Sequence, residues 1–283
     1  MRGALLAEGD GFGLADVHCD GGHGAPGGLG VPEQTGRHGL VFVYRGAFVR
    51  WCDGAEALLD STAAYLAAPG SEQRIAHPVG GDACLAVHLS PGLLAALAGG
   101  SPAVSLPVVP MDTASELAVR RLVALARAGD PDGELAEAVV RAVSGVLARR
   151  IPHRVAAGRP RTAAHDALAR RTRELLLADP SLGVIELSRR VHCSPHHLSR
   201  VFGQVTGSSV SAYRTRVRVG RALDRIAGGE TDLAALASDL GFADHAHLTR
   251  TIRAATGRTP SALRAALAAS TKIADSYPPK LGG

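Results

Sequence analysis

The chain has 283 residues, 46% of them hydrophobic and 20% charged, which is typical of a globular protein with two domains. It has no apolar run of about eighteen residues and carries Glu8 where a signal peptide is apolar, so we expect a cytoplasmic protein without a membrane partner. Residues 1–160 have 13 Arg and Lys against 16 Asp and Glu, a net charge of −3, whereas residues 161–283 have 18 against 10, a net charge of +8. This asymmetry points to a polyanionic partner for the second part.

A small β domain is predicted for the first part of the chain. Residues 1–35 are rich in glycine and show no sustained period. Residues 38–51 are dense in Val, Phe and Tyr and predict two short strands joined by a turn at Arg45-Gly46. Strand patterns follow at residues 62–68, 74–77 and 83–90, with Gly and Pro between them. Short strands at this spacing predict a small β-sandwich or barrel.

Two helices are predicted next, over residues 112–128 and 133–150. The second has an apolar stripe formed by Leu135, Val139, Val143, Val146 and Leu147. A short loop joins the helices, so they form an antiparallel hairpin over residues 109–152. The stripe either packs on the β domain or on a second copy of the chain, and we expect a homodimer.

An internal repeat lies in the last part of the chain. Residues 194–207 (SPHHLSRVFGQVTG) and residues 244–257 (DHAHLTRTIRAATG) share five of fourteen positions at an offset of fifty. Both copies open on an N-capping residue, Ser194 or Asp244, and close on a glycine suited to a left-handed C-cap. A short apolar helix and a tight turn precede each copy, with a small residue, Ser188 or Ala237, at the helix crossing. This is the pattern of two helix-turn-helix units.

The second helix of such a unit places its exposed side chains in the major groove of DNA. Arginine can bond bidentately to guanine there, and Ser, Thr and His can make single contacts. The residues predicted to contact DNA are His196, His197, Ser199, Arg200 and Gln204 in the first copy and His245, His247, Thr249, Arg250 and Arg253 in the second.

A helix predicted from about Ser209 to Ala227 separates the two units. Its apolar positions can pack on both units, which would set the two readers about one DNA turn (~34 Å) apart. Its basic positions are expected to be partly free for phosphate and partly paired with acids such as Asp224 and Asp239; they are Arg214, Arg216, Arg218, Arg221 and Arg225.

Residues 162–268 resemble the AraC/XylS family of transcription activators. The resemblance rests on SPHHLSRVF with its later TG, on Arg218-Val219 with Ala222, on residues 241–244 (GFAD), and on residues 257–260 (GRTP) with Arg264. It implies a seven-helix domain that binds promoter DNA, often with recruitment of RNA polymerase. The sequence departs from the family pattern at Val210, Ala246 and Leu263.

The N-terminal part is similar to the cupin-type sensor domain that such regulators often carry. The resemblance rests on residues 40–50 (LVFVYRGAFVR), on Tyr65 with Pro69-Gly70, and on Arg74 with His77-Pro78 and Gly81-Asp82. It implies a domain that senses a small-molecule effector of unknown identity and often dimerises through helices like those of the hairpin. Candidates to line the ligand pocket are Phe42, Tyr44, Phe48, Trp51, Tyr65, His77 and His88.

The fold predicted is therefore α+β with two domains. A cupin-like β-barrel spans residues 1–108, the helical hairpin 109–152, the double helix-turn-helix domain 162–270 and a flexible tail 271–283. The function predicted is a regulator, with activation favoured over repression, that binds double-stranded promoter DNA and senses a small molecule. In the alternative, the N-terminal domain binds no ligand and only dimerises or contacts another protein.

Catalysis and cofactors are not expected. The sequence has no phosphate-binding glycine loop, no Gly-x-Ser-x-Gly and no His-Glu-x-x-His. Four scattered cysteines do not suggest disulfides in a reducing compartment. No metal site is predicted because the His-x-His of metal-binding cupins is missing; a soft-metal site with Cys19, His23 and a third ligand is the alternative left open.

Overall fold

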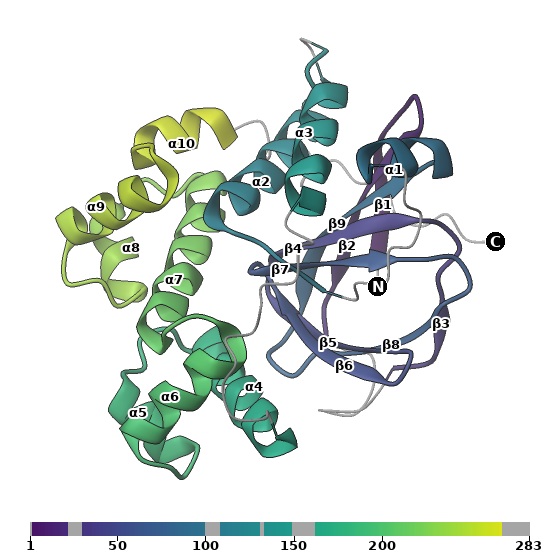
Figure 1. The fold of residues 1–283 in the computed structure, drawn as a ribbon. Helices are drawn as coiled ribbons and strands as arrows, with labels where there is room; N and C mark the ends of the chain where they lie inside the picture. The colour runs from purple at the N-terminus through teal and green to yellow at the C-terminus, as the bar shows by residue number, and fades with distance from the viewer. Residues whose placement is uncertain (1, 22–29, 100–107, 131–132, 149–161, 268–283) are drawn as a thin grey trace.

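The computed structural model describes residues 2–21, 30–99, 108–130, 133–148 and 162–267. The strands are β1 (Arg2–Gly9), β2 (Phe12–Cys19), β3 (Glu33–Gln34), β4 (Gly39–Arg45), β5 (Ala47–Cys52), β6 (Ala55–Asp60), β7 (Ala63–Ala67), β8 (Glu72–Ala76), β9 (Asp82–Leu89) and β10 (Val109–Pro110). The helices are α1 (Pro91–Leu97), α2 (Thr113–Arg127), α3 (Leu135–Leu147), α4 (Ala163–Ala178), α5 (Val184–Arg190), α6 (Pro195–Thr206), α7 (Val210–Ala227), α8 (Leu233–Asp239), α9 (His245–Thr256) and α10 (Pro260–Leu267). The strands form a barrel on one side of the molecule, and helices α4–α10 form a second domain beside it (Figure 1).

The larger of two antiparallel sheets has the strand order β1-β2-β9-β4-β7-β10. Its first two strands form a hairpin around Asp10-Gly11, a dipeptide suited to a two-residue turn. The sequence showed no sustained period within residues 1–35, yet β1, β2 and β3 lie there. β1 is an edge strand that is exposed or half-buried throughout, so its residues lack the alternation that marks a strand with one buried face.

The smaller sheet has the order β3-β8-β5-β6 and faces the larger one. The chain passes from one sheet to the other at Gly46, where the predicted turn is confirmed. Gly46 has a φ of 74°, and a Cβ atom there would lie 2.2 Å from the carbonyl oxygen of Gly81. Only glycine fits this close approach. Phe48, Leu59 and Tyr65 are among the buried side chains between the sheets, as in the predicted cupin-like barrel.

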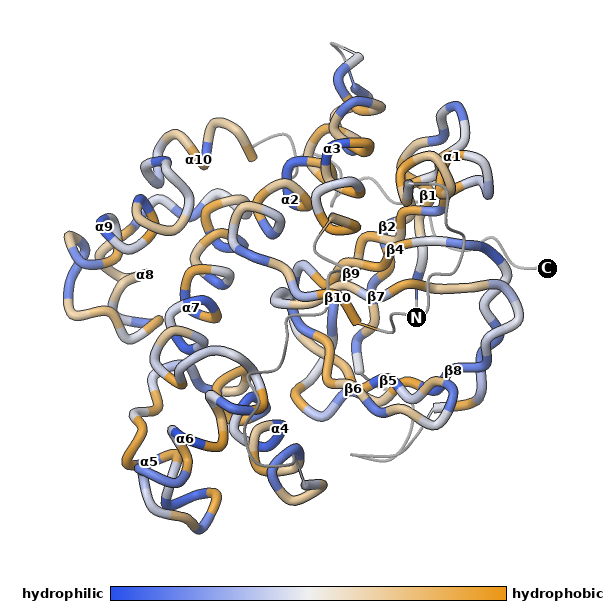
Figure 2. The backbone as a smooth tube through the Cα atoms, in the orientation of Figure 1, coloured by the Kyte–Doolittle hydropathy of each residue, from blue (hydrophilic) through white to orange (hydrophobic). Residues whose placement is uncertain are grey.

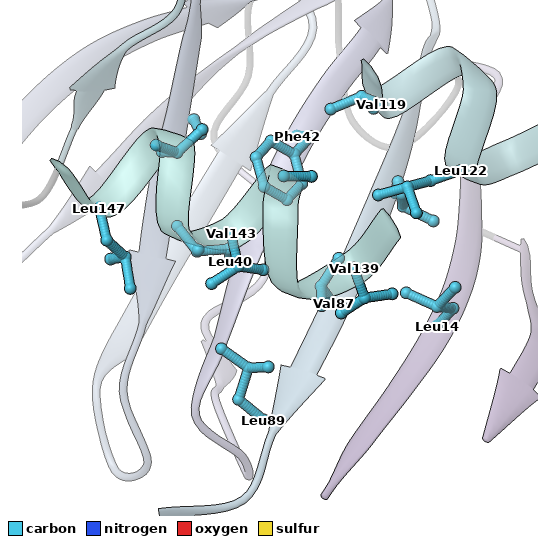
Figure 3. Close-up of a cluster of buried hydrophobic side chains, with 14 of the residues drawn as sticks. Leu14, Leu40, Phe42, Val87, Leu89, Val119, Leu122, Val139, Val143 and Leu147 are labelled. Atoms are coloured by element: carbon cyan, nitrogen blue, oxygen red, sulfur yellow. The ribbon is translucent and has the colours of Figure 1, made fainter. Parts of the chain in front are cut away.

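The hairpin of α2 and α3 packs against the outer face of the larger sheet. Figure 3 shows Val139 and Val143 of α3 directly over Leu40, Phe42 and Val87 of the sheet. The whole predicted stripe is buried there, with no member more than 5% exposed. Two packing partners were expected for the stripe, the β domain and a second copy of the chain. In the structure the stripe packs on the β domain. The homodimer stays a prediction, and it now lacks the support that an exposed stripe would have given.

Helix α7 contributes side chains to both hydrophobic cores of the helical domain. Val217 joins a core shared with α4, α5 and α6, whereas Val219 and Leu223 join one shared with α8, α9 and α10. The two helix-turn-helix units thus sit at opposite ends of α7 (Figure 1). Figure 2 shows the hydrophobic segments gathered in β2, β4 and β9 and interspersed with polar segments in α5–α9. Among the helices in the described ranges, none has both the length and the hydrophobicity of a membrane span.

The packing of α3 makes a prediction about stability. Val139→Ala should lower the free energy of unfolding by about 1–3 kcal/mol, because Val139 is fully buried against the sheet. Val140→Ala is the matched control: its side chain is 39% exposed, so the same change should have an effect below about 0.5 kcal/mol. Urea denaturation followed by the fluorescence of Trp51 measures both, and equal effects would contradict the packing described.

Candidate functional site

A cavity of about 450 Å³ lies between the two sheets of the barrel. Its apolar wall includes Val17, Val41, Phe48, Ile75 and Ala86. Polar side chains that reach it include Glu33, Tyr65, Gln73 and His77. A mostly apolar hollow with a few polar groups is the usual form of a small-molecule site, and the volume lies in the usual range.

Phe48, Tyr65 and His77 are the predicted pocket residues that line this cavity. The other four do not, and the alternation of side chains along a strand explains most of this correction. On β4, Val41 faces the cavity, so Phe42 and Tyr44 point to the opposite face of the sheet. Trp51 lies with Ala47 and Val49 on the outer face of β5. His88 lies further along β9, beside Arg37 and Pro69.

Arg50 is a residue of this region that the sequence reasoning missed. It alternates with Val49 and Trp51 and is buried, at 4% exposure. Its guanidinium carbon lies 4.4 Å from the centre of the Tyr65 ring, and its Nε donates to Gln73 Oε1 at 2.7 Å. Arg50 therefore orients two polar side chains of the cavity wall. Side chains alternate between the two faces of a strand, so if Phe48 points inward, Arg50 does too. This alternation could have identified Arg50 from the sequence.

The first helix-turn-helix unit consists of α5 and α6. The Oγ of Ser194 accepts from the backbone N–H of His197 at 3.2 Å, which begins α6, and Gly207 ends it with a φ of 70°. Leu198, Val201 and Phe202 are buried, so the opposite side of α6 faces outward. Ser188 of α5 is 3% exposed, and its carbonyl accepts from the N–H of Cys193 in the turn.

The second unit, α8 and α9, repeats these contacts. Asp244 accepts from the N–H of His247 at 2.6 Å, and Gly257 ends α9 with a φ of 71°. The carbonyl of Ala237 accepts from the N–H of Phe242, as that of Ser188 does from Cys193. Leu248 and Ile252 are buried. The repeat in the sequence is therefore a repeat of capping, turn and core contacts.

Most of the predicted DNA contacts lie on outward faces of α6 and α9. The exposed ones are His196, Ser199, Gln204, His245, Arg250 and Arg253, and Arg200 is half-buried beside His197 and Gln204. His197 and His247 are also half-buried. The ring of His247 makes an edge-to-face contact with Phe242, and its Nδ1 accepts from the N–H of Ala243. This histidine therefore stabilises the turn between α8 and α9. The hydroxyl oxygen of Thr249 is covered and has no partner among the described residues.

All five arginines of α7 bond within the chain, where the sequence had left part of them for phosphate. Arg225 pairs with Asp239, as expected, and with Glu230. Arg214, Arg218 and Arg221 donate to backbone carbonyls at the end of α4 and before α5. Arg216 pairs with Glu116 of α2. These arginines therefore hold the domain together and join it to the hairpin.

Comparison with known proteins identifies the helical domain. Residues 187–266 match the family described as "Helix-turn-helix domain". The chain is also 30% identical over 89 residues to the arabinose operon regulatory protein of Escherichia coli (strain K12), and equally so to that of Salmonella typhimurium. The C-terminal domain belongs to the AraC/XylS family. The alignment covers 31% of this chain and 30% of the E. coli protein, so the likeness concerns about a third of that regulator and not the whole of it.

Solved structures resemble the chain more distantly. ToxT from Vibrio cholerae, bound to an unsaturated fatty acid, covers 96% of this chain and all of its own at 10% identity and a TM-score of 0.36. A cupin superfamily protein from Desulfitobacterium hafniense covers 31% of this chain and 76% of its own at 18% identity and a TM-score of 0.26. TM-scores this low carry no functional inference.

Buried charges join the AraC-type domain to the barrel. Arg120 of α2 donates to Asp224 of α7 at 2.9 Å and to the carbonyl of Tyr44 on β4 at 2.6 Å. Arg173 of α4 donates at 2.6 Å to Asp60 at the end of β6, and Tyr213 of α7 donates to the same carboxylate. None of these pairings was predicted, because the partners are 76 to 153 residues apart in the sequence.

The carboxyl group of Asp60 is held in its charged form. Burial alone raises its pKa, but the charge of Arg173 and hydrogen bonds from Thr62 and Tyr213 outweigh burial, and the pKa is lowered. The stability that Asp60 contributes is therefore present above its unfolded pKa and is lost as the pH falls through its folded pKa.

We predict that Arg173→Ala lowers the free energy of unfolding by about 3–5 kcal/mol at neutral pH, because it leaves Asp60 buried without its charged partner. The difference from the wild type should shrink as the pH falls toward the lowered pKa of Asp60, since without Arg173 burial raises the pKa of that carboxyl and the variant becomes neutral there first. Arg189→Ala is the control, because Arg189 is 75% exposed and pairs with Glu186, which is itself 42% exposed. Urea titrations at several pH values measure both; a pH-independent loss would contradict the role given to Asp60.

Proposed function

We propose that the protein is a sequence-specific DNA-binding transcription regulator, not an enzyme, with an N-terminal barrel that senses a small molecule. The observation that carries this proposal is the pair of capped helix-turn-helix units at the two ends of α7, each with polar side chains on the outward face of its second helix. Promoter DNA is the partner of that surface. Activation through contact with RNA polymerase, and a homodimer, are further parts of the proposal.

Helices α6 and α9 enter successive major grooves on one side of the duplex. Arg200 and Arg250, which are equivalent in the repeat, each read a guanine, and His196, Ser199 and His245 add single contacts. Outside these contacts the units differ. The first has His196 where the second has Ala246, whereas the second has the exposed Arg253 where the first has Gly203. We infer that the first unit contributes more base contacts and the second more phosphate contacts.

The sensing role rests on the cavity and on what surrounds it. Val41 of β4 lines the cavity, and three residues further along the strand the carbonyl of Tyr44 accepts from Arg120. Asp60, which binds Arg173 and Tyr213, lies in the sheet opposite. A molecule that shifts either sheet therefore changes the bonds of Arg120 or Asp60, and these bonds hold α7 in position. The arabinose in the name of the E. coli relative is not carried over, because the alignment covers too little of either chain.

The DNA contacts can be tested on a promoter fragment recovered by genome-wide capture with the purified protein. Arg200→Ala and Arg250→Ala should each weaken specific binding by about 1–3 kcal/mol and relax preference at one base pair. Arg141→Ala is the control, because Arg141 is an equally charged, exposed residue on α3, on the hairpin rather than on a recognition helix. Fluorescence anisotropy at several salt concentrations measures affinity and its salt dependence. Unchanged binding in both α6 and α9 variants would refute these roles.

The sensing role is tested by filling the cavity. A compound that binds the folded protein raises its melting temperature, so a thermal-shift screen of the full chain identifies candidate effectors. Ala86→Phe should abolish the shift, because Ala86 lines the cavity, whereas Ala55→Phe, at an exposed position of β6, should leave it unchanged. Both variants should still bind DNA. A shift that survives Ala86→Phe would place the compound elsewhere, and a screen without any shift favours a barrel that only makes protein contacts.

A further inference from the structure

A sulfur, a nitrogen and an oxygen donor meet in the wall of the barrel cavity. Cys19 ends β2, His77 follows β8 and Asp82 begins β9, and all three line the cavity. One potential ligand atom from each lies within 4.8 Å of the other two. The Sγ of Cys19 is 3.9 Å from His77 Nδ1, and His77 Nε2 is 2.7 Å from Asp82 Oδ1. The three side chains are buried, so this is not a solvated surface cluster.

The backbone around these residues is closely fitted. Cys19 and Asp82 are direct partners in the ladder between β2 and β9. A Cβ atom on Gly81 would lie 2.2 Å from the carbonyl oxygen of Cys19, so only glycine lets the two segments approach this closely. The fold therefore brings the three donors together before any ion binds.

The donor set suits zinc or a similar transition ion. Zinc binds thiolate at about 2.3 Å and imidazole at about 2.0–2.1 Å in a tetrahedral arrangement, which puts the two ligand atoms roughly 3.5 Å apart. The distance of 3.9 Å between Cys19 Sγ and His77 Nδ1 needs only a small contraction. The carboxylate of Asp82 bonds to the other ring nitrogen, Nε2, and has to turn toward Nδ1 to complete the site. A thiol, an imidazole and a carboxylate together favour such an ion over calcium or magnesium, which prefer oxygen ligands.

Cys84 lies behind the cluster. Its Sγ donates to Asp82 Oδ2 at 2.9 Å, leaving Oδ1 turned toward His77. Side chains that hold a ligating carboxylate in this way orient the ligand and tune the affinity of the metal.

An ordinary buried His–Asp pair would explain two of these residues but not the third. Cys19 adds a soft donor at the same point, and the three donors border an open volume of about 450 Å³. Three protein ligands with a fourth position open to a cavity are the arrangement of a zinc ion that accepts an exogenous ligand, whereas structural zinc sites are closed by four.

We propose that the barrel binds one divalent transition ion of the zinc type through Cys19, His77 and Asp82, with its remaining position facing the cavity. On binding, the thiol of Cys19 releases its proton to solvent and the sulfur binds as thiolate. This site differs from the one left open by the sequence, which paired Cys19 with His23. His23 lies outside the described residues, and the partners of Cys19 come instead from segments some 60 residues away. The proposal does not depend on DNA binding.

Cobalt(II) is the probe, because thiolate ligation to it gives a charge-transfer band in the near ultraviolet. The full chain, treated with chelator and kept reduced, should develop this band and saturate at one equivalent. Cys19→Ser should abolish the band, and His77→Gln should weaken binding strongly. Cys84→Ala should retain the band with about 10–100-fold weaker affinity, as expected of a side chain that only orients a ligand. Cys52→Ser is the control, since Cys52 is also buried but bonds to Asp53 away from the cluster.

Zinc provides a second readout that does not depend on the band. It should raise the melting temperature of the wild type and of Cys52→Ser, and leave that of Cys19→Ser and His77→Gln unchanged. Far-ultraviolet circular dichroism checks that each variant is folded, and Cys19→Ser and His77→Gln supply independent tests should one of them unfold. The proposal is overturned if the wild type gives no band and no shift, or if both persist in a folded Cys19→Ser variant.

Discussion

One guanidinium group, that of Arg120, bonds to both the barrel and the helical domain. Arg120, only 5% exposed on its side chain, bonds to the carbonyl of Tyr44 on β4 and to Asp224 on α7. It therefore joins the barrel, the hairpin and the helix that carries both helix-turn-helix units. Removing one partner of a buried ion pair leaves an uncompensated charge, so such contacts tend to be made or broken as a whole. Together with the bonds of Arg173 and Tyr213 to Asp60, this contact fixes the position of the AraC-type domain relative to the barrel.

The same arrangement supplies a route by which the proposed sensing could be coupled to DNA binding. The arginines of α7 make internal bonds and are not spread over DNA, which leaves base and phosphate contact to α6 and α9. Because α7 joins the two units, its placement sets their spacing. The strands that contact α7 and α4 are also strands of the barrel that encloses the cavity. Under the proposed function, a molecule or metal ion bound in the barrel would therefore shift the two helix-turn-helix units through these buried contacts.

The sequence predicted what depends on local pattern. The repeat, its caps at Ser194 and Asp244, the turn at Gly46 and the stripe of α3 could all be read from residue types and spacing. The sequence did not show which face of a strand is inside, and so Phe42 and Trp51 were assigned to a pocket that alternation excludes. It also could not show long-range partners. The contact of Asp60 with Arg173 and the meeting of Cys19 with His77 depend on how distant segments pack, and nothing in the local sequence records it.

The central claim is that both helix-turn-helix units read one stretch of DNA together. Hydroxyl-radical footprinting of the full chain on its captured promoter site tests this most directly. Two protected segments on the same side of the duplex, centred about one helical turn (~34 Å) apart, are the result expected from units held by a rigid α7. Alanine at Arg200 should weaken protection of one segment and alanine at Arg250 that of the other. A single protected segment, lost equally in both variants, would contradict the account.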